Sequence, residues 1–153
     1  MEQTEIYNTR ETGVAGLLSA TYHFMMSKIM DRLVVEGYRD ISKTQLHVLA
    51  RFDSEGMTLN EISQRVQISV HIVSNIIKML VTEGYVFEAE GGTGIGDYKY
   101  VLTDHGYRVL DIVSKEQKAV EEEWQQYLGE RELSLVISSL QRLFKATLRA
   151  KQE

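Results

Sequence analysis

The chain has 153 residues, of which 43% are hydrophobic and 25% are charged, a composition typical of one globular domain and not of a disordered chain. The formal net charge of −5 taken alone argues against a nucleic-acid partner. The absence of cysteine excludes disulfides, thiolate metal sites and cysteine nucleophiles. No apolar run approaches the ~18 residues of a membrane span, and residues 1–13 show no signal-peptide pattern. We therefore expect a cytoplasmic protein with no membrane partner.

Long helices are predicted near both ends of the chain. Apolar residues recur at three- and four-residue spacing from Val14 to Leu33, which predicts an amphipathic helix over residues 12–37 that ends near Gly37. The same periodicity resumes after Thr103 and predicts a helix of about 25 residues that ends at Gly129. A final apolar stripe predicts a closing helix after it.

Three short helices are predicted between residues 42 and 84. Ser42 with Gln45 and Thr58 with Glu61 have the spacing of capping boxes, in which each N-cap and the third helical residue bond reciprocally. Ser69 is a candidate N-cap of the third short helix, which is predicted to end at Gly84. In the first of these helices we expect the following residues on the buried side: Leu46, Leu49, Ala50 and Phe52.

A glycine-rich segment, GGTGIG at residues 91–96, separates two short runs rich in tyrosine, valine and phenylalanine. Such runs predict a β-hairpin. A phosphate-binding loop would require a helix directly after the glycines, whereas the sequence here continues as the strand-like DYKYVLT. The segment is therefore predicted to be the tip of a hairpin and not a nucleotide site.

The predicted fold is mainly α with a small β-hairpin wing. The long terminal helices carry more apolar surface than one chain of this size needs to bury, and a two-fold symmetric homodimer would cover it. The alternative is that these faces pack on the three short helices of the same chain.

Three segments resemble the winged helix-turn-helix of the MarR-type transcriptional regulators: ISKTQLHVLARF, the run from MTLNEIS to LVTEGYV, and YVLTDHG. The resemblance implies one MarR-like domain over residues 1–153, with the winged helix-turn-helix at about 41–108 and a dimerisation layer at 12–37 and 109–150. It further implies a homodimeric regulator that binds a pseudo-palindromic operator on double-stranded DNA. The recognition helix would span about 69–83 and the Gly-rich wing about 90–98.

The predicted recognition helix has a core side, formed by Val73, Ile76, Ile77 and Leu80, and an opposite polar stripe. Asparagine can read adenine, and lysine or a protonated histidine can read guanine. Any surface helix also presents a solvated polar face, so the position within the resemblance decides in favour of DNA. The candidate DNA-binding residues are Ser69, His71, Ser74, Asn75, Lys78 and Lys99.

The wing departs from the family pattern. MarR-type wings carry an Asp-x-Arg whose arginine enters the minor groove, whereas Asp97-Tyr98-Lys99 offers a lysine further along the chain. The segment from Val66 to Tyr107 contains fewer basic than acidic residues. The basic residues are Lys78 and Lys99, and the acidic ones are Glu83, Glu88, Glu90, Asp97 and Asp104. Weak or salt-sensitive DNA binding is one interpretation. The other is a winged-helix protein-interaction module that has lost strong DNA binding.

The resemblance also implies a small-molecule effector at the meeting of the dimer helices and the winged unit, with Tyr22, His23 and Met26 as the candidate pocket. The alternative is that such side chains at helical spacing belong to the core. The four histidines are scattered along the chain, so we expect no metal site. The sequence contains no motif of a catalytic nucleophile, so we expect no enzymatic activity. We expect no cofactor.

Overall fold

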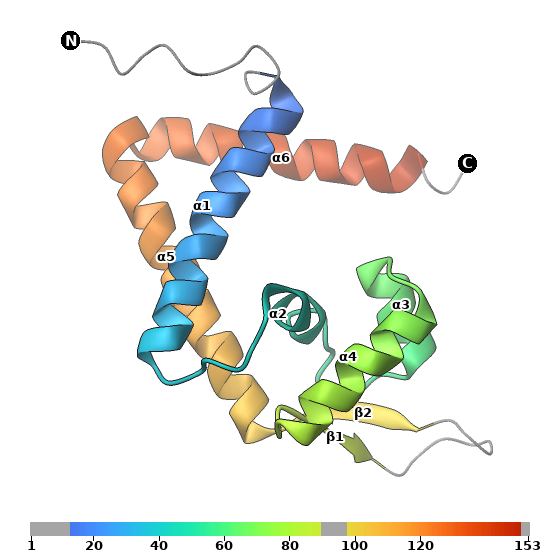
Figure 1. Cartoon of the computed structure of the whole chain (residues 1–153). Helices are drawn as coiled ribbons and strands as arrows, with labels where there is room; N and C mark the ends of the chain where they lie inside the picture. Colours follow the sequence, from blue (N-terminus) through green and yellow to red (C-terminus); the bar gives the residue numbers. More distant parts are fainter. Residues whose placement is uncertain (1–12, 90–97, 151–153) are drawn as a thin grey trace. The chain divides into compact units, whose positions relative to one another are not determined.

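The computed structural model describes residues 13–89 and 98–150 of the chain (Figure 1). Within these ranges it contains six helices and one antiparallel hairpin, and none of the helices is both long and apolar enough to cross a membrane. The chain divides into two compact units, one ending at Glu116 and one beginning at Gln117, and each is described by itself. The elements are α1 (Val14–Val35), α2 (Lys43–Leu49), α3 (Leu59–Val66), α4 (Val70–Thr82), β1 (Val86–Ala89), β2 (Lys99–Leu102), α5 (Asp104–Leu128) and α6 (Glu130–Ala150).

Both predicted capping boxes are confirmed. At the start of α2, Gln45 N donates to Ser42 Oγ at 3.2 Å, and Ser42 N donates to Gln45 Oε1 at 2.8 Å. At the start of α3, Glu61 N donates to Thr58 Oγ1 at 3.3 Å, and Thr58 N donates to Glu61 Oε2 at 2.7 Å. Each box satisfies two backbone donors that the first turn of a helix otherwise leaves unpaired.

The predicted helix ends are also confirmed. Gly37, Gly84 and Gly129 follow α1, α4 and α5 with φ of 95°, 79° and 80°. Glycine is the residue that adopts this left-handed conformation without a steric penalty. The chain therefore turns sharply after each of these helices.

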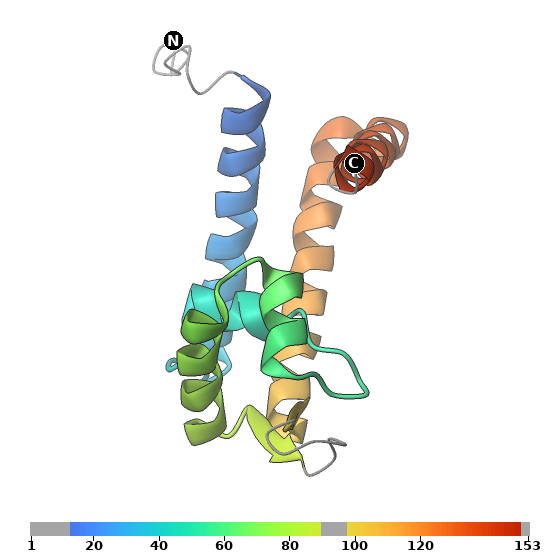
Figure 2. The ribbon, with the colours of Figure 1, turned by 90° about the vertical axis from the view of Figure 1, so that its right-hand side faces the viewer.

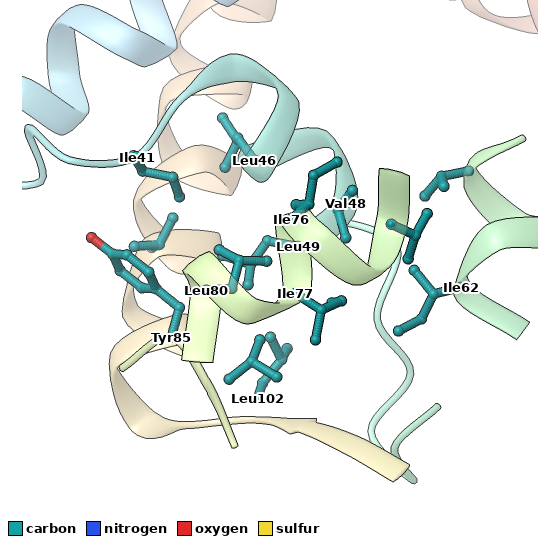
Figure 3. Close-up of a cluster of buried hydrophobic side chains, with 14 of the residues drawn as sticks. Ile41, Leu46, Val48, Leu49, Ile62, Ile76, Ile77, Leu80, Tyr85 and Leu102 are labelled. Atoms are coloured by element: carbon teal, nitrogen blue, oxygen red, sulfur yellow. The ribbon is translucent and has the colours of Figure 1, made fainter. Parts of the chain in front are cut away.

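The core of the first unit lies among α1, α2, α3, α4, the hairpin and the first part of α5. Figure 3 shows Ile76, Ile77 and Leu80 of α4 within a cluster that includes Leu49 of α2 and Leu102 of β2. Full burial of each such side chain contributes roughly 1.5–3 kcal/mol. Leu46 and Leu49 are buried as predicted and Phe52 is half-buried, but Ala50 is exposed. The prediction for Ala50 was wrong because α2 ends at Leu49, and Ala50 is its C-cap.

The hairpin joins the end of α4 to the start of α5 (Figure 2). Its strands pair antiparallel, with Val86 opposite Leu102 and Ala89 opposite Lys99. The loop before α3 adds a third strand-like contact, in which Met57 N donates to Tyr100 O at 2.9 Å and Tyr100 N donates to Met57 O at 2.8 Å. The glycine-rich segment at 91–96 lies outside the described residues.

The first turn of α5 lies directly against Tyr85, the residue before β1. A Cβ placed on Gly106 would lie 2.4 Å from the Tyr85 carbonyl oxygen, a distance that excludes any side chain at this position. The close approach brings Thr103 within bonding range as well, since its N donates to Tyr85 O at 3.0 Å. The hairpin is therefore anchored to α5 at its base.

We expect Gln45→Ala to lower the free energy of unfolding by about 2 kcal/mol or more, because it removes a buried side chain that accepts from Ser42 N and donates to Glu83, the C-cap of α4. Glu61→Ala is the matched control. It breaks the equivalent half of the α3 box on an exposed side chain, so it should cost at most about 1 kcal/mol. Urea unfolding measures both. Equal losses would contradict the structural role assigned to Gln45.

Candidate nucleic-acid interface

The rotation of α4 is set by its buried side. Val73, Ile77 and Leu80 are at most 1% exposed and Ile76 is 8% exposed. The polar stripe therefore faces solvent on the opposite side: His71, Asn75, Lys78 and Thr82 are exposed and Ser74 is half-buried. A stripe of this kind, presented on the second helix of a helix-turn-helix, is positioned to enter a major groove.

The turn between α3 and α4 fixes how the stripe is presented. Gln67 adopts the left-handed conformation, with φ of 58°, which is uncommon for any residue other than glycine. Ser63 Oγ donates to Ile68 O at 2.6 Å, and Ile68 N donates to Ser63 O at 3.3 Å. Both bonds tie the turn back onto α3.

Ser69 is the N-cap residue of α4, as predicted from its position. Its side chain forms no capping hydrogen bond, while its carbonyl accepts from Val73 N at 3.0 Å. The Ser69 hydroxyl is exposed at the N-terminus of α4, where the helix dipole favours an anion such as a phosphate.

The C-terminal end of α4 is held by two long-range hydrogen bonds, which we call the α4 brace. Gln45 Nε2 donates to Glu83 Oε2 at 2.6 Å, and Tyr85 Oη donates to Asp40 Oδ1 at 2.7 Å. The Tyr85 ring stacks on His105 of α5, with centroids 4.6 Å apart and planes 10° apart. The end of α4 is thus linked to α2, to the segment before α2 and to α5.

The α4 brace perturbs two titratable groups. The pKa of Glu83 is raised because burial disfavours its charged form and Asp40 repels it, while the hydrogen bond from Gln45 acts in the opposite direction. The pKa of Tyr85 is also raised, first by burial and then by its hydrogen bond to the Asp40 carboxylate. Both groups are therefore held in a site that favours the protonated form.

Lys99 lies at the start of β2 and is half-buried. It lines an open cavity of about 510 Å³ together with Met57, Glu61 and Arg65. The pKa of Glu61 is lowered, mainly by hydrogen bonds from Thr58, with smaller contributions from the charges of Lys99 and Arg65. The carboxylate of Glu61 therefore offsets part of the positive charge beside the hairpin.

Arg65, another cation near this face, has protein partners. Arg65 Nη1 donates to Arg51 O at 3.1 Å, and its Nη2 lies 3.6 Å from Asp53 Oδ2. Lys78 is the only lysine or arginine on α4. Two of the five acidic residues counted in the sequence, Glu90 and Asp97, lie outside the described residues, as does most of the predicted wing at 90–98.

The structure places the candidate effector residues on α1, in the first unit. Tyr22 and His23 are exposed and in edge-on contact, with ring centroids 6.0 Å apart. His23 Nδ1 lies 2.7 Å from Ser19 O of the preceding turn. Met26 is half-buried against the core. Within the described part of the chain, no cluster of three His, Asp or Glu side chains could hold a metal ion.

The α4 brace was not predicted from the sequence. Gln45 was noted for its capping spacing and the LVTEGYV run for its resemblance, yet their contact joins residues 38 positions apart. Tyr85 and Asp40 are 45 positions apart. The one available signal was Gln45 itself, a polar residue on the side of α2 whose other members are apolar.

A helix-turn-helix followed by a two-stranded hairpin, with long helices before and after it in the chain, is a winged helix-turn-helix fold. Solved structures of this class are similar to the chain, as the sequence resemblance predicted. No protein-family model matches the chain, and no curated protein matches it. The likeness to solved structures therefore concerns the fold.

Three of these structures come from different bacteria. Staphylococcus aureus MepR in a DNA complex is 20% identical over 88% of this chain and 98% of its own, with a TM-score of 0.68. Streptococcus pneumoniae FabT in complex with DNA is 17% identical over 86% and 94%, with a TM-score of 0.69. The transcriptional regulator Tm0710 from Thermotoga maritima is 19% identical over 90% and 95%, with a TM-score of 0.63.

We expect Glu83→Gln to raise the free energy of unfolding at pH 7, because it removes a disfavoured charge and keeps an acceptor for Gln45. The folded protein binds the Glu83 proton more tightly than the unfolded chain. The stabilisation that Glu83 contributes to the folded protein is therefore fully present below its ordinary pKa near 4.5. It is lost as pH rises through the raised pKa.

The gain of Glu83→Gln should accordingly vanish below about pH 4. Urea unfolding across the pH series measures this, with the exposed Glu121→Gln on α5 as the charge-matched control. A gain that does not depend on pH, or one equal to that of the control, would contradict the assignment.

Proposed function

We propose that the protein is a homodimeric transcriptional regulator that binds a pseudo-palindromic site on double-stranded DNA. The observation that carries this proposal is the rotation of α4, which buries its apolar side and presents a polar stripe outward. MepR and FabT, which share the fold, are described in complexes with DNA. Contact of α4 with DNA would account for the polar stripe on its outward side.

Each candidate residue receives a role from its chemistry. Asn75 would pair with adenine, and Lys78 or a protonated His71 would contact guanine or phosphate. Ser69 and Ser74 would contact the backbone near the N-terminal end of α4, and Lys99 would contact a phosphate beside the wing. Few cations support these contacts, so the affinity should be modest and sensitive to salt.

Dimerisation would use the helical layer at residues 12–37 and 109–150, with the winged helix-turn-helix at 41–108. Exposed apolar side chains on α1 and α6 support this assignment, because apolar surface of this extent is usually covered by a partner. On α6 they are Leu135, Val136, Ile137, Leu140, Leu143, Phe144 and Leu148, each at least 38% exposed. A two-fold axis would pair these faces and place two copies of α4 about one helical turn of DNA apart.

We expect Phe144→Asp to shift the protein from dimer to monomer, because it would bury a charge in the apolar interface. Phe144 is 61% exposed in the single chain, so the folded protomer should tolerate the change. Sedimentation equilibrium measures the mass, and circular dichroism checks that the helices remain. An exposed residue of α3 outside the helical layer, changed as Gln64→Asp, is the control. A dimer that persists in Phe144→Asp would place the interface elsewhere.

A small-molecule effector would bind at Tyr22, His23 and Met26. The support is the edge-on contact of the Tyr22 and His23 rings beside the half-buried Met26. MepR has also been solved with ethidium bromide. A planar apolar ligand would suit such an aromatic and thioether surface.

Selection of duplexes from a random pool at low salt tests the proposed function. An enriched pseudo-palindrome is the expected result. If a folded, dimeric protein enriches no sequence, the alternative of a protein-interaction module is favoured. The observation behind that alternative is the charge count of the sequence, in which five acidic and two basic residues lie between Val66 and Tyr107.

With the selected duplex, we expect Asn75→Ala and Lys78→Ala to relax base preference at single positions, at roughly 1–3 kcal/mol each. Lys99→Ala should instead weaken binding to all sequences. It should also make the slope of log K against log salt concentration less steep by about 1.8 for a dimer, because each lost phosphate contact removes about 0.9. Anisotropy titrations on matched and mismatched duplexes measure both effects. Unchanged preference in both α4 variants would refute the assigned roles.

A further inference from the structure

The outward side of α4 also carries apolar side chains. Val70, Ile72, Met79 and Val81 are 40%, 50%, 51% and 38% exposed. Single exposed apolar residues are normal on a protein surface. Here, however, they border both sides of the stripe that faces outward, so whatever the stripe contacts also meets these side chains.

Ile72 and Met79 lie on one flank of the stripe and Val70 and Val81 on the other, because residues seven or eleven apart return to the same side of a helix. Asn75 is three residues after Ile72 and four before Met79, so it lies between them. Ile72 and Met79 are about 10 Å apart along the helix axis, a distance that covers about three base-pair steps of DNA. The order along this flank is thus apolar, amide, apolar.

The chemistry of this flank matches one kind of base pair. In the major groove thymine presents a C5-methyl group, which apolar side chains contact, and adenine presents the donor and acceptor that asparagine pairs with. Guanine is most often read by arginine or lysine, and the one such residue of α4, Lys78, belongs to the polar stripe and not to this flank.

We propose that Ile72 and Met79 determine sequence specificity by contacting thymine methyl groups on either side of an adenine that Asn75 reads. This inference rests on the proposed DNA-binding function and gives that function a substrate class: half-sites with A·T pairs at the positions beneath this flank. On this surface polar groups alternate with apolar ones. Such a mixture suits the edges of DNA bases better than it suits the centre of a protein–protein interface, which is more apolar.

The test replaces each thymine of the selected duplex, one at a time, by deoxyuridine, which removes only the C5-methyl group. Two thymines per half-site, about three base pairs apart, should be sensitive to this change. Replacing either one should lower the affinity of the wild-type protein for the duplex about fourfold. Ile72→Ala should abolish the sensitivity at one of them, and Met79→Ala at the other. Val81→Ala, on the opposite flank of the same helix, is the matched control and should keep both.

The outcomes separate the two levels of the proposal. If the wild-type protein binds the duplex but tolerates uracil everywhere, the methyl readout is wrong and the DNA-binding function stands. Methyl sensitivity that survives in both alanine variants, or selected half-sites with G·C pairs at these positions, also overturns the readout. If the folded protein binds no duplex, both proposals fail together. Thermal unfolding by circular dichroism confirms that each variant is folded.

Discussion

The burial of one side of α4 is the constraint on which the rest of the molecule depends. Val73, Ile76, Ile77 and Leu80 fix the rotation of the helix against α2, α3 and the hairpin, and each contributes roughly 1.5–3 kcal/mol. This rotation decides which residues face outward, so one set of packing contacts determines both the stability of the unit and the surface it offers. A different rotation would bury Asn75 and Lys78 at high cost.

The ends of α4 are also positioned by polar contacts. The left-handed Gln67 and the Ser63–Ile68 bonds fix its start. The α4 brace fixes its end, with Gln45 both accepting from Ser42 N in the α2 capping box and donating to Glu83. Since a buried amide without partners would be costly, this residue couples the formation of α2 to the placement of α4.

The sequence predicted the features that depend on local chemistry. Capping boxes at Ser42 and Thr58 and the glycines after three helices act within a few residues, so spacing alone reveals them. The prediction for Ala50 was wrong because periodicity cannot tell a last helical turn from a C-cap. The Tyr85–Asp40 contact had no sequence signal, since it joins residues 45 positions apart. The roles of the individual α4 residues remain predictions, because they depend on a partner and not on the chain.

The most direct measurement is the affinity of the protein for its selected duplex across a salt series. If Lys78 and Lys99 of both protomers contact phosphates, four contacts give a slope of about −3.6 in log K against log salt. Affinity should then fall about a hundredfold between 50 and 200 mM salt. A change of less than about twofold over that range would contradict the account, because binding that neutralises phosphates must release counterions.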